Sequence, residues 1–145
     1  MQDIIKPDGT PYRAKNSFTY VTSDLSASLA PAASTTFSFN IDGDSDFFWT
    51  KITAFANIAN DGTTYDVQVL PGVTLLITNN TTGRNYSNNP VALPGMAGTA
   101  LLPLIMPMMT YWGSKSTITI AVANITDDDT YTRLQLQFHG IKGYL

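Results

Sequence analysis

Residues 35–41 read TTFSFNI, in which polar and apolar side chains alternate from Thr36 onward. The apolar positions are Phe37, Phe39 and Ile41, and a polar residue stands before each of them. Because successive side chains of an extended strand point to opposite faces of a sheet, this period of two predicts a strand with one buried face and one solvated face.

The same alternation returns near the end of the chain, in residues 117–124 and 131–139. These segments predict two more half-buried strands, with Asp127, Asp128 and Asp129 at the tip of a hairpin between them. The side chains expected to point inward are Ile118, Ile120, Val122, Leu134, Leu136 and Phe138. Those expected to point outward from the last strand are Arg133, Gln135, Gln137 and His139.

The middle of the chain contains two further strand regions. Residues 47–58 predict a long strand in which the bulky rings of Phe47, Phe48 and Trp49 anchor the core. The dipeptide Pro71-Gly72 predicts the turn of a hairpin that joins residues 64–70 to residues 73–78. The expected inward residues of this hairpin are Val67, Val69, Val73, Leu75 and Ile77.

The overall pattern is typical of an all-β protein. No window combines helix-forming residues with the apolar spacing of an amphipathic helix, so we expect little helix. Seven or eight strands separated by turn residues predict an antiparallel β-sandwich or jelly roll over residues 35–145. Residues 1–34 contain a turn signal and a run of small residues, with a candidate strand at residues 17–22 between them, and they predict an extended N-terminal arm.

The composition excludes several kinds of chemistry. Among 145 residues there are 11 acidic side chains, all Asp, with one His and no Cys. Thiolate catalysis and Cys-based zinc sites are therefore excluded, and a Ser-His-Asp triad has no G-x-S-x-G motif to support it. We expect no enzymatic activity and no cofactor.

Charge and hydropathy limit the partners. The net charge of -3 argues against nucleic acid, because phosphate contacts require a basic patch. Pro and Gly interrupt the apolar stretch at residues 90–109, which is unlike a membrane-spanning helix. We expect neither a nucleic acid nor a membrane as partner.

Asp42, Asp44 and Asp46 have the opening spacing of a calcium-binding loop. An EF-hand also needs Gly at its sixth position and Glu at its twelfth, where this chain has Phe47 and Thr53. A solvated turn between strands is the favoured interpretation. The three Asp residues are the only candidate metal ligands that we name.

Residues 100–109 read ALLPLIMPMM, which is too apolar to lie exposed in an isolated subunit without favouring association. The prolines exclude a central strand, so we expect an edge strand or an extended segment. In one interpretation the segment covers the core of its own domain. In the other, an interface with a second subunit or a capsid contains Leu104, Met106, Met108, Met109, Tyr111 and Trp112.

The aromatic residues of this region also permit a carbohydrate site. Tyr86, Tyr111 and Trp112 would stack on sugar rings, and the Asn-rich residues 85–89 would bond to hydroxyl groups. Packing of these rings within the protein or against a sister subunit is the favoured interpretation.

Four segments carry a resemblance to a known group of proteins. They are FSFNIDGDSDFFW at residues 37–49, GRN at 83–85, LPLIMP at 102–107 and FHGIKGY at 138–144. With these segments the chain resembles small virion structural proteins of tailed bacteriophages, and within that group the jelly-roll capsid cement, or decoration, proteins. The resemblance covers residues 35–145.

The resemblance implies a dimer or trimer on the outer capsid surface of the virion, where it bridges neighbouring major capsid proteins and stabilises the head. The expected interface consists of the apolar segment together with Tyr12 and Arg13 of the arm. The alternative is a phage tail, collar or fibre-associated protein, including a carbohydrate-binding β-sandwich module.

Overall fold

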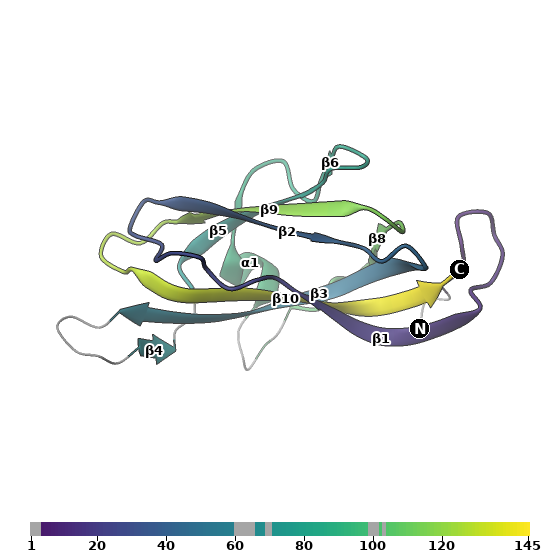
Figure 1. Ribbon diagram of the computed structural model, residues 1–145, viewed down its shortest axis with the longest axis horizontal. Coiled ribbons are helices and arrows are strands. Elements are labelled where there is room, and N and C mark those ends of the chain that lie inside the picture. The colour runs from purple at the N-terminus through teal and green to yellow at the C-terminus, as the bar shows by residue number, and fades with distance from the viewer. Residues whose placement is uncertain (1–3, 60–65, 69–70, 99–101, 103) are drawn as a thin grey trace.

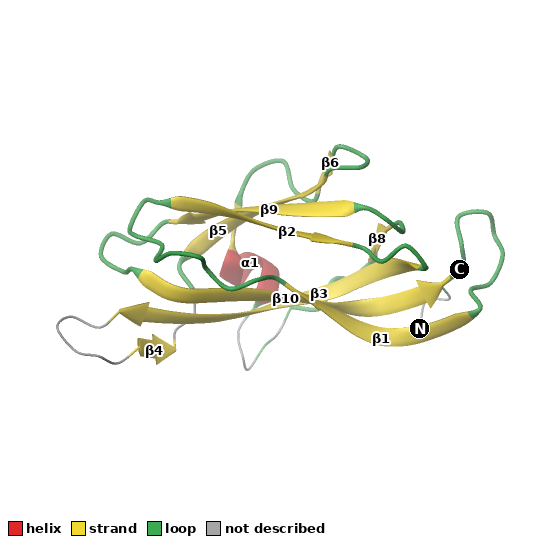
Figure 2. Ribbon diagram, viewed as in Figure 1, coloured by secondary structure: helices red, strands yellow, loops and turns green. Residues whose placement is uncertain are grey.

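A computed structural model describes residues 4–59, 66–68, 71–98, 102 and 104–145. Two antiparallel sheets pack face to face as a β-sandwich (Figures 1 and 2). The all-β prediction is therefore confirmed.

The first sheet contains the first and the last strand of the chain. Its order is β1 (Ala14–Val21), β10 (Tyr131–Tyr144), β3 (Ser45–Ala59) and β4 (Asp66–Gln68). β8 (Thr110–Trp112) also pairs with β3, at the end of β3 opposite to β4.

The second sheet follows the order β2 (Ser34–Asn40), β9 (Thr117–Asn124), β5 (Val73–Asn79) and β6 (Arg84–Asn85). β7 (Val91–Ala92) pairs with β5 as well. The short helix α1 (Leu93–Ala97) lies between the layers, with Leu93 and Met96 buried (Figure 2). In the described part of the chain, no helix is long and apolar enough to cross a membrane.

The chain alternates between the two sheets along its principal strands. β1, β3, β8 and β10 belong to the first sheet, whereas β2, β5 and β9 belong to the second. The first strand lies beside the last, and β2 lies beside β9. Repeated crossing between two antiparallel sheets is typical of a jelly roll.

The core lies between the two inner faces. Phe37, Ile118, Ile120, Leu134 and Leu136 are all buried, as the alternation predicts. Val73, Leu75 and Ile77 are also buried, and so is Phe138.

Three large rings, from β3, β8 and β10, contact one another within this core. The ring centroids of Trp49 and Trp112 are 5.1 Å apart, and Phe138 lies 5.4 Å from Trp49 and 5.8 Å from Trp112. Rings at these separations gain both buried area and favourable edge and stacking contacts. The prediction that Trp49 belongs to the core is confirmed.

A β-bulge lies in the middle of the first sheet. Lys51 pairs with His139 and Trp49 pairs with Gly140, so Thr50 has no opposite residue in β10. A Cβ atom on Gly140 would lie 2.1 Å from the Phe48 carbonyl oxygen, which explains why glycine stands there. The extra residue shifts the inward positions of β3 from Phe47 and Trp49 to Ile52.

The extended N-terminal arm is not confirmed. Residues 14–21 form β1, which pairs with β10 along its whole length. Tyr20 of β1 is buried and contacts the Phe47 ring at 4.9 Å. β1 is therefore a strand of the sandwich, because its inner face completes the core beside the last strand.

Two predicted hairpins are wrong. β4 belongs to the first sheet and β5 to the second, so Pro71-Gly72 lies in a connection between sheets. β9 and β10 likewise belong to different sheets, and residues 127–129 cross from one to the other. The side chains of Val67 and Val69 lie outside the described residues.

Candidate functional site

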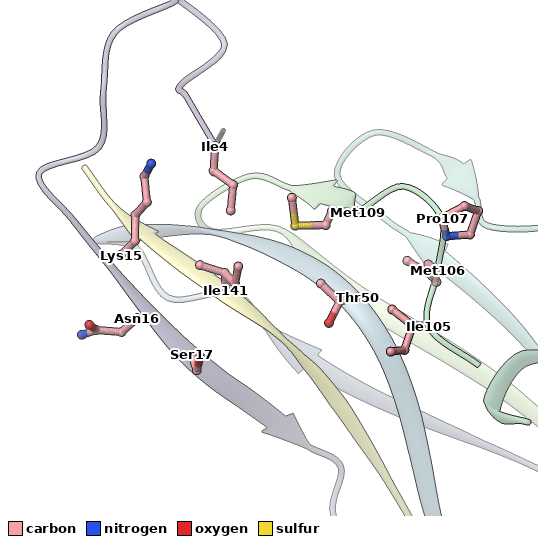
Figure 3. A pocket seen from close by; sticks show the side chains of 10 residues that line it. All are labelled: Ile4, Lys15, Asn16, Ser17, Thr50, Ile105, Met106, Pro107, Met109 and Ile141. Carbon is pink, nitrogen blue, oxygen red and sulfur yellow. The ribbon is translucent and has the colours of Figure 1, made fainter. Parts of the chain in front are cut away.

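A groove of about 580 Å³ crosses the outer face of the first sheet, the face turned away from the second sheet (Figure 3). Its floor contains Ser17 of β1, Ile141 of β10 and Thr50 of β3. Phe47 and Trp49 point into the core, and alternation therefore turns Ile141, which is opposite Phe48, outward.

The segment of residues 104–109 forms one wall of this groove. The Met106 amide donates a hydrogen bond to the Thr50 carbonyl oxygen at 2.9 Å. The Leu104 amide donates to the Ala97 carbonyl oxygen at 3.0 Å. These bonds hold the segment beside the bulge of β3.

The groove is mainly apolar. Ile4, Ile105, Met109 and Ile141 surround one hollow in Figure 3 and come from segments far apart in the sequence. Lys15 is the only charged side chain among the described residues that line it. Such a surface favours an apolar partner with a few polar contacts at its border.

An apolar ridge, defined as Leu104, Ile105 and Met108, stands beside the groove. The three side chains are 41%, 66% and 70% exposed. Three large apolar side chains are thus exposed within five residues of one segment, whereas apolar residues exposed singly are common on protein surfaces.

The structure divides the predicted interface residues into three groups. Leu104 and Met108 are exposed on the ridge, and Met109 is partly buried in the groove wall. Met106 and Trp112 are only 8% and 4% exposed and contact the core of their own chain. These two side chains therefore do not offer a surface to a second subunit.

The two predicted arm residues also differ from each other. Arg13 is exposed next to β1. Tyr12 is 7% exposed, and its hydroxyl donates a hydrogen bond to Asp46 Oδ2 at 2.6 Å. Burial and the Asp46 carboxylate together raise the pKa of Tyr12, so its hydroxyl stays protonated. Tyr12 therefore has a structural role in this chain.

The three Asp residues of the candidate calcium loop lie in different surroundings. Asp46 is buried, and its other oxygen accepts a hydrogen bond from the Ser114 amide at 2.8 Å. Asp42 is paired with Lys142, and Asp44 is exposed. No group of three metal-ligating side chains converges within the described residues.

Lys142 is a buried cation that the sequence pattern misses. It is 4% exposed, and its Nζ lies 3.6 Å from the Phe18 ring centroid and 5.3 Å from that of Tyr20. Burial opposes the charged form, but the bonds to Asp42 and the contacts with Tyr20 outweigh it and raise the pKa of Lys142. The available signal was the period of two, which places Lys142 on the same face of β10 as Leu136 and Phe138.

His139, the single histidine, lies on the outer face of the first sheet. Its Nδ1 lies 3.1 Å from Thr19 Oγ1, and its Nε2 lies 2.8 Å from Thr53 Oγ1. Burial and the charge of Lys51 lower the pKa of His139, and both therefore favour the neutral ring. Hydroxyl groups of two neighbouring strands thus lie within hydrogen-bond distance of both ring nitrogens.

A second cleft lies between the exposed edges of the two sheets. It brings together Tyr86, Tyr111, Trp112 and Asn85, which the sequence offers as a carbohydrate site. Tyr86 and Tyr111 are 42% and 44% exposed, whereas Trp112 lies at the boundary with the core. This cleft shares no lining residue with the groove.

Comparison with known proteins supplies no relative. No protein-family model, curated protein or solved structure matches the chain. The function is therefore inferred from the residues and surfaces described above.

Proposed function

We propose that the chain is a non-enzymatic structural protein of a tailed-phage virion, a cement protein that binds the outer capsid surface. In this role it forms a homo-oligomer, bridges neighbouring major capsid proteins and stabilises the head. The observation that carries the proposal is the exposed apolar ridge beside the apolar groove. The sequence resemblance to cement proteins supplies the particular setting.

The ridge and the groove favour burial against another protein. Transfer of a large aliphatic side chain from water to an apolar contact stabilises an interface by about 1.5–3 kcal/mol when burial is complete. Leu104, Ile105 and Met108 begin partly to largely exposed, so each has area left to bury. Repeated over many copies on a shell, such contacts oppose expansion of the lattice.

The edge of the first sheet continues this surface. Lys15, Asn16 and Ser17 of β1 line the groove, and β1 pairs with β10 on one side only within the described part of the chain. An edge strand offers unpaired backbone donors and acceptors to a neighbouring strand. The proposed contact therefore combines apolar side chains with a polar strand edge.

The proposal is tested by adding the purified chain to phage heads that lack it. We expect saturable binding, and we expect Met108→Asp to weaken the binding at least about tenfold, because the new carboxylate must lose water at the contact. Ile125→Asp is the matched control, since Ile125 is 58% exposed and does not line the groove.

Two results would contradict the proposal. One is the absence of saturable binding to heads, and the other is equal loss of binding in the Ile125→Asp control. Binding to purified tails or fibres in place of heads would assign the chain to the tail, collar or fibre.

A further inference from the structure

The second cleft has the composition of a ligand site and not of a packing defect. It has a volume of about 710 Å³ and opens between β6 of the second sheet and β8 of the first. Small-molecule sites are usually concave, of about 300–1,000 Å³, and combine aromatic side chains with a few placed polar groups. The cleft meets each of these conditions.

Two tyrosines line the cleft, Tyr86 directly after β6 and Tyr111 within β8. The Tyr86 ring lies 4.8 Å from the buried Trp49 ring, and the Tyr111 ring lies 5.5 Å from the Phe48 ring. Each tyrosine is thus positioned by one aromatic neighbour while more than two fifths of it stays exposed. Rings fixed before binding lose little conformational freedom when a flat apolar face packs on them.

Amide groups supply hydrogen bonds at the same place. Asn79 Oδ1 accepts from the Thr81 amide at 3.0 Å, and Asn85 Oδ1 accepts from Thr78 Oγ1 at 2.8 Å. These bonds fix the orientation of both side chains. The Nδ2 groups of Asn79 and Asn85 have no partner among the described residues, so both are donors available to the cleft.

The cleft carries a positive charge in an acidic protein. Arg84 is exposed, and it is the only charged residue among the described residues that line the cleft. It forms no ion pair within the described part of the chain. A guanidinium group binds a carboxylate through two parallel hydrogen bonds, which makes Arg84 a specific site for that group.

We propose that this cleft binds an acidic carbohydrate, with a sugar ring against Tyr86 and its carboxylate on Arg84. The less polar C–H face of a pyranose ring suits the Tyr86 ring, and its hydroxyl groups suit the amide donors of Asn79 and Asn85. The proposal goes beyond the role in a capsid and does not depend on it, because the cleft and the groove have no residue in common.

The test is a calorimetric titration of the full chain with a short oligogalacturonate and with a neutral oligoglucan of equal length. We expect the acidic oligomer to bind at least about tenfold more tightly, and added salt to reduce this difference. Arg84→Gln should remove most of the preference. Arg13→Gln is the matched control, since Arg13 is an exposed arginine outside the cleft.

A second variant tests the aromatic contact. Tyr86→Ala should weaken binding of the acidic oligomer at least about tenfold while the chain remains folded by circular dichroism. If Tyr86→Ala unfolds the chain, Arg84→Gln alone decides, because the Arg84 side chain is exposed. The proposal is overturned if neither oligomer binds, if both bind equally, or if Arg84→Gln binds like the wild type.

Discussion

Asp24 shows how one carboxylate holds two strands of the fold. Its Oδ1 accepts from the amides of Leu25 and Leu134, at 2.9 and 3.0 Å, and its Oδ2 accepts from Arg133 Nε at 2.7 Å. Burial opposes ionisation, but these bonds and the Arg133 charge outweigh it and lower the pKa of Asp24 below 3.8. The residue therefore links the chain after β1 to the start of β10 most strongly when it is charged.

The shift gives a pH-dependent prediction for Asp24→Asn. A carboxylate with a lowered pKa in the folded state stabilises the protein above its ordinary pKa, and this contribution disappears as the pH falls through the folded value. We expect Asp24→Asn to lower the free energy of unfolding by about 1 kcal/mol at pH 7, and the difference from wild type to shrink below pH 3.8.

Urea denaturation at neutral and acidic pH measures this difference. Asp128→Asn is the control, because Asp128 lies exposed in the connection between β9 and β10. A destabilisation by Asp24→Asn that stays constant down to the most acidic pH would show that the charge of Asp24 contributes nothing.

At the scale of elements, alternation predicts single strands well. The expected strand at residues 117–124 coincides with β9, and the strand at 35–41 differs from β2 by one residue at each end. The strand at 131–139 is too short, because Gly140, Lys142 and Gly143 interrupt the apolar pattern in the second half of β10. Gly140 is required by the close Phe48 carbonyl, and Lys142 is stabilised by Asp42, and neither contact is local in sequence.

Pairing between strands is harder to predict, because it depends on topology. In a fold that alternates between sheets, strands adjacent in sequence face each other across the core, so turn signals at Pro71-Gly72 and at residues 127–129 do not produce hairpins. The groove depends on the same topology. Its residues Ile4, Thr50, Met109 and Ile141 are far apart in sequence, and only the apolar segment itself is visible beforehand.

The segment at residues 104–109 permits a direct test of which side chains face inward. Met106→Asp should lower the free energy of unfolding by about 3 kcal/mol, because it places a carboxylate in the core. Met108→Asp should change it by no more than about 0.5 kcal/mol, since Met108 is 70% exposed. Urea denaturation of both variants decides, and equal destabilisation would contradict this orientation of the segment.

On the scale of the whole molecule, the two candidate sites divide the surface by chemistry. The groove on the first sheet adjoins the ridge and has mostly aliphatic and Met side chains in its lining, whereas the lining of the cleft between sheet edges contains aromatic rings, amide groups and Arg84. The aliphatic groove suits permanent contact with protein, because its gain comes from area removed from water. The cleft suits a soluble ligand, because its amide groups and Arg84 offer defined partners to hydroxyl and carboxylate groups.

The apolar site predicts the behaviour of the isolated chain in solution. As the proposed homo-oligomer, the wild type should sediment as a dimer or trimer, and dilution should shift it toward the monomer. Ile105→Asp should shift the distribution toward the monomer at every concentration, because Ile105 belongs to both the ridge and the groove and is 66% exposed. Ile125→Asp, which adds the same charge at an exposed apolar position outside the groove, should sediment like the wild type. Self-association through the ridge is wrong if the wild type is monomeric at high concentration or if both variants dissociate equally. In that case, contact with the capsid protein alone would have to cover these side chains.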